Sequence, residues 1–85
     1  MDPLDGNAIG GMLAEIFGAD MTAAVGTCAT CGNRRHVAEA VVYLQAPGTV
    51  VRCRTCTAVL MLLVRRREAY CVDLRGLAFL EPSLA

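Results

Sequence analysis

An apolar stripe runs along the first part of the chain, between residues 4 and 18. Asp5 carries a side chain suited to an N-cap, and Gly18 suits the left-handed residue that commonly follows the last helical turn. The pattern therefore predicts an amphipathic helix over residues 4–18. The stripe falls at positions i, i+3, i+4, i+7 and i+8 and consists of Ile9, Met12, Leu13, Ile16 and Phe17.

The remainder of the chain consists of short segments rich in β-forming residues. Proline fixes φ and glycine tolerates positive φ, so Ala46-Pro47-Gly48 predicts a turn. The apolar run at residues 58–64 is continuous, which predicts a strand that is central or buried on both faces. Residues 19–27 are expected to form a connector, and residues 65–68 a polar turn. The predicted strands cover residues 37–44, 49–52, 58–64, 69–74 and 77–80.

A length of 85 residues limits the fold to one small domain. Domains of this size bury a low fraction of their surface and are marginal without a disulfide or a metal. The hydrophobic fraction of 55% excludes a disordered chain. We expect a single domain over residues 1–85 of the α+β class. Its helix at 4–18 would precede an antiparallel sheet of three to five strands within residues 28–80.

Two cysteine pairs carry the strongest chemical signal in the sequence. Cys28 and Cys31 form one pair, Cys53 and Cys56 form the other, and 21 residues separate the pairs. A two-residue spacer lets a tight turn direct both sulfur atoms at one point, and two such turns make a tetrahedral four-thiolate site suited to zinc. Such a site has no open coordination position. The one zinc ion expected here is therefore structural and not catalytic. The sequence thus predicts a metal-bound α+β domain, with a zinc ribbon at 28–80 after the helix at 4–18.

Other interpretations of these cysteines stay open at the level of sequence. Tetrahedral sulfur ligation also suits an iron centre. A thiol-based redox sensor that releases zinc on oxidation would use the same residues. His36 follows Cys31 by five residues and is a further candidate ligand, although four cysteines already complete the site.

Cys71 is the fifth cysteine and lies outside both pairs. Alternation along residues 69–74 puts it on the strand face that carries Asp73 and Arg75, which would make it an exposed redox thiol. Free cysteine more often behaves as a small buried residue, and burial is the favoured expectation.

Charge is unevenly distributed, although the chain as a whole is neutral. Residues 28–67 contain seven arginines and one glutamate, whereas the segments on both sides are acidic. The guanidinium group suits recognition of phosphate or carboxylate. These side chains are expected either to contact a partner or to form a solvated rim that keeps an apolar domain soluble. They are Arg34, Arg35, Arg52, Arg54, Arg65, Arg66 and Arg67.

The sequence offers little for catalysis or for membrane insertion. It contains one histidine and shows no Ser/His/Asp set, acid dyad or glycine-rich phosphate loop. The longest apolar run has seven residues, whereas a spanning helix needs about 20. No basic residue precedes the N-terminal apolar stretch, as it would in a secretory signal. We therefore expect a non-enzymatic cytoplasmic chain without membrane contact, in a compartment where paired cysteines favour metal over disulfides.

Several further segments, together with the cysteine pairs, resemble zinc-ribbon proteins. More narrowly, they resemble a family of short uncharacterised actinobacterial zinc-ribbon domain proteins. The resemblance implies zinc bound at the two cysteine pairs and no known reaction. The segments are Leu4-Asp5-Gly6-Asn7-Ala8, Phe17-Gly18, Met21-Thr22-Ala23-Ala24, Ala46-Pro47-Gly48 and Val72-Asp73-Leu74-Arg75-Gly76.

Together these features predict a structural zinc-binding interaction module, regulatory or associated with transcription or translation machinery. A protein partner is the main expectation. Nucleic acid bound by the arginines is the alternative, but a neutral chain with two phenylalanines and two tyrosines offers limited phosphate attraction and base stacking. The sequence leaves the oligomeric state open.

Overall fold

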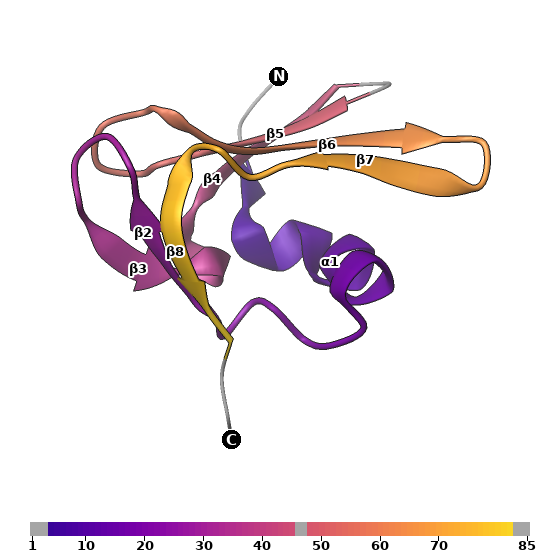
Figure 1. The fold of residues 1–85 in the computed structure, drawn as a ribbon, viewed down its shortest axis with the longest axis horizontal. Helices are drawn as coiled ribbons and strands as arrows, with labels where there is room; N and C mark the ends of the chain where they lie inside the picture. Colours follow the sequence, from indigo (N-terminus) through magenta and orange to yellow (C-terminus); the bar gives the residue numbers. More distant parts are fainter. Residues whose placement is uncertain (1–3, 46–47, 83–85) are drawn as a thin grey trace.

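The computed structural model describes residues 4–45 and 48–82 of the chain (Figure 1). It contains two antiparallel sheets, one of five strands and one of three, and a short helix near the N-terminus. The predicted α+β class is confirmed, and the three-stranded sheet is additional to the one predicted. The elements in order are β1 (Leu4–Asp5), η1 (Gly6–Ile9), α1 (Gly10–Phe17), β2 (Val25–Cys28), β3 (Arg34–His36), η2 (Val37–Glu39), β4 (Val41–Gln45), β5 (Gly48–Arg52), β6 (Val59–Arg66), β7 (Ala69–Asp73) and β8 (Leu77–Glu81).

The N-terminal helix begins later than its apolar stripe predicts. Leu4 and Asp5 form the short strand β1, which pairs with β4, and the chain then makes one 3₁₀ turn before α1. Asp5 does act as an N-cap, because its Oδ1 accepts a hydrogen bond from the Asn7 N–H at 3.1 Å. Gly18 ends α1 with a φ of 74°, as predicted, and donates its N–H to the Ala14 carbonyl at 2.8 Å. None of the helices among residues 4–45 and 48–82 is long and apolar enough to cross a membrane.

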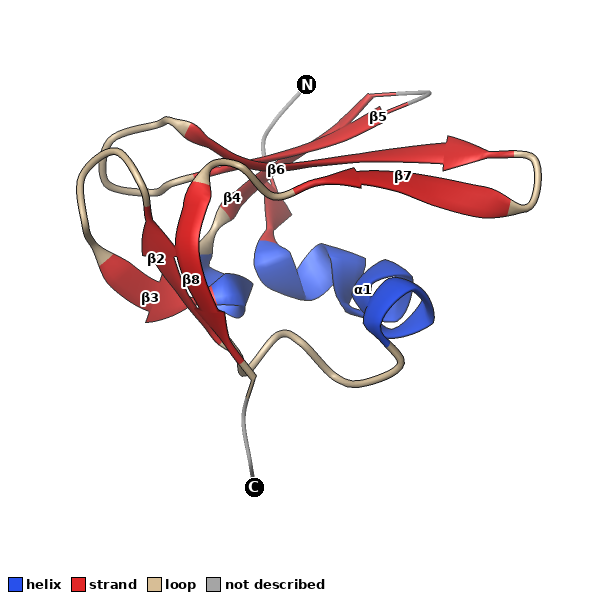
Figure 2. Cartoon of the chain, viewed as in Figure 1, coloured by secondary structure: helices blue, strands red, loops and turns tan. Residues whose placement is uncertain are grey.

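The five-stranded sheet has the order β1-β4-β5-β6-β7. The strands predicted at 49–52, 69–74 and 77–80 form within one residue of those bounds, as β5, β7 and β8. The apolar run at 58–64 forms β6, which is paired on both edges, so the predicted alternative of a central strand is confirmed and that of burial on both faces is wrong. Leu63 is 1% exposed, whereas its neighbour Leu62 is 37% exposed, because helices cover only one face of this sheet (Figure 2).

Other sequence-based boundaries need correction. Residues 25–27 of the predicted connector form β2 together with Cys28, and β2 pairs with β3 and β8 in the second sheet. The strand predicted at 37–44 starts only at Val41, because the Glu39 carboxylate accepts from the His36 N–H and turns the chain into η2. Arg65 and Arg66 belong to β6, so the predicted polar turn shortens to residues 67–68. Ala46 and Pro47 of the other predicted turn lie outside the described residues.

The core lies between the inner face of the five-stranded sheet and the helical segment. Ile9 and Leu13 from the helical segment are 2% and 0% exposed and belong to one apolar cluster with the inner sheet residues. The three-stranded sheet closes this core at one end, where Leu77 and Leu80 of β8 pack against it. The buried apolar residues of the larger sheet are Val42, Val51, Met61 and Leu63.

Candidate metal centre

The four paired cysteines come from the ends of strands in both sheets. Cys28 ends β2 and Cys31 lies in the turn before β3, so this pair belongs to the three-stranded sheet. Cys53 follows β5 and Cys56 lies in the turn before β6, so the second pair belongs to the five-stranded sheet. A metal ion held by all four would therefore tie the two sheets together.

Both cysteine turns have the same backbone geometry. The carbonyl of Cys28 accepts from the Gly32 N–H at 2.9 Å, and the carbonyl of Cys53 accepts from the Thr57 N–H at 2.9 Å. In each turn the N–H of the first cysteine also donates to the carbonyl five residues later, at 3.0 and 2.8 Å. Arg52 stabilises the second turn by donating to the Thr57 carbonyl at 2.9 Å. These repeated bonds fix the direction of each pair of sulfur atoms.

The sulfur atoms have the spacing of a tetrahedral thiolate site. The Sγ atoms of Cys28 and Cys56 are 3.6 Å apart, and those of Cys31 and Cys53 are 3.8 Å apart. All four lie within 4.8 Å of one another. Four sulfur atoms at about 2.3 Å from a central zinc ion would be separated by about 3.8 Å, so the four residues fit one metal ion.

The local environment gives the thiols of Cys28, Cys53 and Cys56 different pKa values. Burial raises the pKa of Cys28, but hydrogen bonds from the backbone N–H groups of Cys31 and Thr30 outweigh it and bring the pKa down to about 7. The pKa of Cys53 is lowered by the same balance, with burial opposed by two backbone N–H groups in its own turn. At Cys56 one backbone N–H favours the thiolate, but burial and the neighbouring thiols raise the pKa to about 12. Without a cation the cluster therefore retains protons, which a metal ion would displace.

The two other candidate residues lie outside this ligand set. His36 is not among the four clustered ligands; its Nδ1 lies 3.7 Å from the Glu39 carboxylate. Cys71 is exposed, so its favoured burial is wrong. The reason is that Cys71 points away from the core on β7, at the edge of the five-stranded sheet.

The arginines beside the metal centre mostly contact other parts of the chain. Arg34 donates to both carboxylate oxygens of Glu81 at 3.0 and 3.1 Å and thereby links β3 to the C-terminal end of β8. Arg35 lies 3.6 Å from the Glu39 carboxylate. Arg54 donates its Nε to the Glu39 carbonyl at 2.6 Å, which fixes the second cysteine turn against η2. Together with Arg52, which donates to the Thr57 carbonyl, four of the seven predicted contact residues thus have structural partners.

The arginines at the end of β6 form a separate group. The β6–β7 turn lies at the opposite end of the molecule from the cysteine turns (Figure 1). Arg65 places its guanidinium 6.0 Å from the centroid of the Tyr70 ring. Arg66 and Arg67 make no ion pair or hydrogen bond within the described part of the chain. The seven arginines therefore do not form one continuous basic patch.

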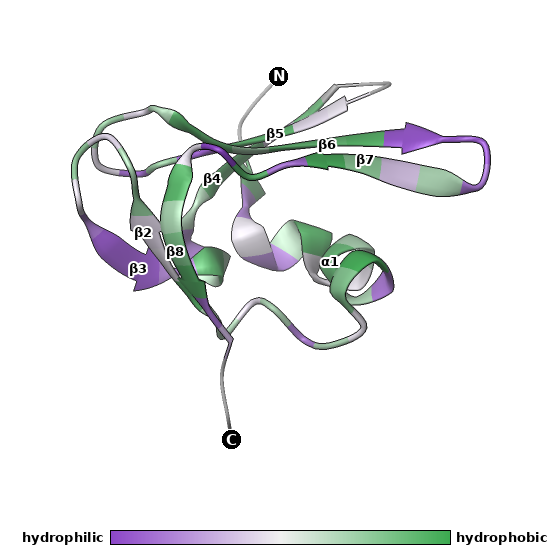
Figure 3. Cartoon of the chain, in the orientation of Figure 1, coloured by the Kyte–Doolittle hydropathy of each residue, from purple (hydrophilic) through white to green (hydrophobic). Residues whose placement is uncertain are grey.

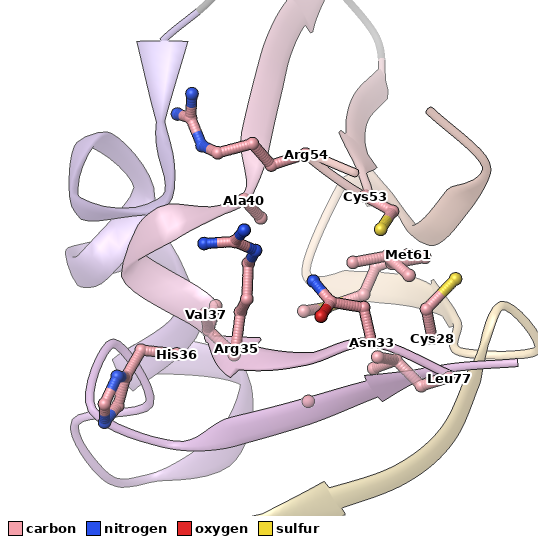
Figure 4. Close-up of a pocket in the computed structure, with 12 residues that line it drawn as sticks. Cys28, Asn33, Arg35, His36, Val37, Ala40, Cys53, Arg54, Met61 and Leu77 are labelled. Atoms are coloured by element: carbon pink, nitrogen blue, oxygen red, sulfur yellow. The ribbon is translucent and has the colours of Figure 1, made fainter. Parts of the chain in front are cut away.

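A shallow pocket, which sequence reasoning missed, adjoins the metal centre. Figure 4 shows the sulfur atoms of Cys28 and Cys53 at one side of it and His36 at the far side. Arg35 and Arg54 contribute the guanidinium groups, but both already contact Glu39. No local sequence signal marks this pocket, because residues from both sheets build it. Its remaining lining residues are Gly26, Asn33, Val37, Ala40, Leu60, Met61 and Leu77.

The comparisons with known proteins name no activity and no ligand. No curated protein and no solved structure matches the chain. One family matches over residues 1–85, the whole sequence. The chain thus belongs to the family of unknown function DUF6510.

Proposed function

We propose that this chain is a non-enzymatic interaction module with one structural zinc ion, and that it binds a protein partner through its five-stranded sheet. The observation that carries the proposal is an apolar sheet face that no helix of the described chain covers (Figure 2). The resemblance of the sequence to short actinobacterial zinc ribbons favours a role in regulation or in transcription or translation machinery.

The donor set supports zinc as the metal. Four thiolates at tetrahedral spacing leave no coordination position for water or substrate, which is the arrangement of structural zinc sites. An iron centre on the same residues is the alternative and would absorb visible light. Metal analysis of the purified chain tests the assignment. One zinc per chain without visible absorption would support it, whereas iron or no metal would contradict it.

The sheet register defines the proposed binding face. Tyr43, Val50 and Leu62 lie side by side across β4, β5 and β6, and Val64 lies beside Cys71 on the next row. Because their neighbours in sequence point into the core, these side chains point away from it. Figure 3 shows apolar residues continuing along β5 and β6 up to the arginines of β6. We name Tyr43, Val50, Leu62, Val64 and Cys71 the outer face.

An exposed apolar face favours a protein partner over nucleic acid. Contiguous apolar patches mark interaction sites in soluble proteins, and the outer face brings apolar side chains of neighbouring strands together. Nucleic acid needs a continuous basic surface, but the arginines divide between the two ends of the molecule. The proposal therefore assigns the arginines beside the metal a structural role.

A matched pair of variants tests the outer face. Leu62 and Leu44 are both 37% exposed, but Leu44 lies on the other face of the sheet. Leu62→Glu should abolish partner binding, measured by crosslinking in native cell extract and mass spectrometry, whereas Leu44→Glu should retain it. Equal crosslinking by both variants would contradict the proposal. Binding of the wild-type chain to DNA or RNA that weakens steeply with salt would favour the nucleic-acid alternative.

A further inference from the structure

The two edge strands of the five-stranded sheet differ in length. β1 has only two residues, whereas β7 at the other end has five, and within the described residues no strand pairs with its outer side. We propose that β7 pairs antiparallel with β7 of a second copy of this chain. The two sheets then form one ten-stranded sheet across a two-fold axis through Cys71. This inference goes beyond the proposed function, because it rests on the backbone edge of β7, although the Cys71 side chain also belongs to the outer face.

The hairpin register shows which backbone groups face the open edge. A two-residue turn joins β6 to β7, and the pair that flanks it is Arg66 with Ala69. In a two-residue hairpin this flanking pair is hydrogen-bonded, and the pairs then alternate along the ladder. Cys71 and residue 73 are therefore also hydrogen-bonded to β6. The N–H and C=O groups of Tyr70 and Val72 point to the open edge, where a second strand can bind them.

One symmetric register uses the whole strand. With Cys71 on the two-fold axis all five residues of β7 pair, whereas a register centred on Tyr70 or Val72 pairs only three. Tyr70 then faces Val72 of the second copy, and each such pair exchanges two hydrogen bonds. Cys71 faces its own counterpart in a non-hydrogen-bonded pair, where the two Cα atoms are about 4.5 Å apart. That separation is within the range of a disulfide.

Charge complementarity supports the same register. Asp73 of the second copy lies opposite Ala69 on the same sheet face, with Ala69 between it and Arg66. Its carboxylate already accepts from Arg75 of its own chain at 2.7–3.1 Å, so Arg66 would join an existing ion pair. Two strand spacings amount to about 9.6 Å, which an arginine and an aspartate side chain span together across the small alanine. Arg66 has no other partner within the described residues, and the symmetry gives two such contacts. In this register Arg67 would face Arg75 of the second copy, but both like-charged residues lie outside the paired strand Ala69–Asp73.

The edge itself carries few of the usual obstacles to pairing, and its one charged residue, Asp73, is paired with Arg75. Proteins protect exposed edges with proline, lysine, bulges or very short strands. β7 contains no proline or lysine, and its pairing with β6 shows no register shift. Ala69, Cys71 and Val72 are exposed, so a second strand can approach. An edge of five residues buries less surface than a standard interface, so the association should be reversible and depend on concentration.

Sedimentation of the zinc-loaded full chain over a range of concentrations tests the pairing. The mass should double as concentration rises, and a monomer at every soluble concentration would overturn the proposal. Ala69→Asp places like charges opposite each other twice and should weaken association about tenfold. Ala69→Asn has the same size without the charge and should associate as the wild type does. Equal weakening by both variants would overturn the register, provided that both retain zinc and the wild-type circular dichroism spectrum.

Thiol crosslinking tests the axis directly. Diamide accepts the two electrons and two protons released when two thiols form a disulfide, so it serves as the oxidant. Peptide mapping should find a disulfide between Cys71 residues of two copies, formed faster as the dimer fraction rises. Cys71→Ser should keep the concentration-dependent mass but lose this crosslink. A wild-type dimer that forms no such disulfide would overturn the placement of Cys71 on the axis.

Discussion

Gly32 and Thr57 occupy equivalent positions in the two cysteine turns, with φ angles of 76° and 67°. Each residue follows the second cysteine of its pair and donates its N–H to the carbonyl of the first, at 2.9 Å. Glycine adopts this left-handed conformation without steric cost, whereas a β-branched residue does not. Thr57 is the one non-glycine residue with such a φ among residues 4–45 and 48–82, so the second turn carries backbone strain that the first avoids.

The strain at Thr57 predicts a stabilising substitution. Thr57→Gly should raise the free energy of unfolding of the zinc-loaded chain by about 0.5–1 kcal/mol, because relief of the left-handed strain exceeds the entropy that glycine loses on folding. Gly32→Thr introduces the same strain in the first turn and should lower the free energy by about 1–2 kcal/mol. Denaturant unfolding measures both values. If Thr57→Gly instead lowers the free energy of unfolding, the lost hydrogen bond contributes more stability than relief of the strain adds. That bond runs from the Thr57 Oγ1 to the Cys56 carbonyl at 2.6 Å in the wild type.

Metal removal should unfold the chain, because the four cysteines join two sheets that share a small core. Structural zinc contributes an apparent ~10–16 kcal/mol in zinc-finger peptides, which equals or exceeds the whole stability of a typical domain of ~5–15 kcal/mol. Chelation, or Cys53→Ser, should therefore abolish the cooperative thermal transition seen by circular dichroism. Cys71→Ser removes a thiol outside the centre and is the control. An unchanged transition in the chelated chain would contradict the proposed role of the metal.

Metal affinity should rise with pH. Only thiolates bind the metal, so protons compete with it at low pH. Below about 7 the Cys28 thiol is protonated, and above this value Cys56, with its pKa near 12, still carries a proton that the metal must displace. Affinity should therefore increase about tenfold or more for each pH unit, and more steeply below pH 7. Competition with a chelator of known affinity measures this, and equal affinities at pH 6 and pH 8 would contradict it.

The cysteine pairs were predictable from sequence because two-residue spacing is a local property of the chain. The strands β5, β7 and β8 were predictable for a similar reason, since turn residues and alternation bound them. The missed elements depend on distant contacts instead. β2 forms as a strand because β3 and β8 pair with it, and no apolar alternation marks its residues. Arginines beside the cysteines indicated a binding surface, but only the fold shows that Glu39 and Glu81 engage three of them.

The delayed start of the N-terminal helix illustrates the same limit. The apolar stripe and Asp5 predict a helix from residue 4, and nothing local opposes it. In the fold Gly6 lies against η2, where an added Cβ would stand 1.8 Å from the Val37 carbonyl oxygen. Close contact between these two backbone segments is available only to glycine, and it brings β1 beside β4 before the helix begins.

The close approach of Gly6 to η2 predicts opposite effects for substitutions of Gly6 and of Gly11. Gly6→Ala should lower the free energy of unfolding by about 2 kcal/mol or more, because the new methyl group forces two backbone segments apart in a packed region. Gly11 lies within α1, and apart from its chain neighbours and the nearby helix backbone no atom lies within 4 Å of an added Cβ. Gly11→Ala should therefore stabilise the chain by up to about 1 kcal/mol through helix propensity alone. Denaturant unfolding of the two zinc-loaded variants measures the difference, and equal effects would show that η2 moves aside to accept a side chain at residue 6.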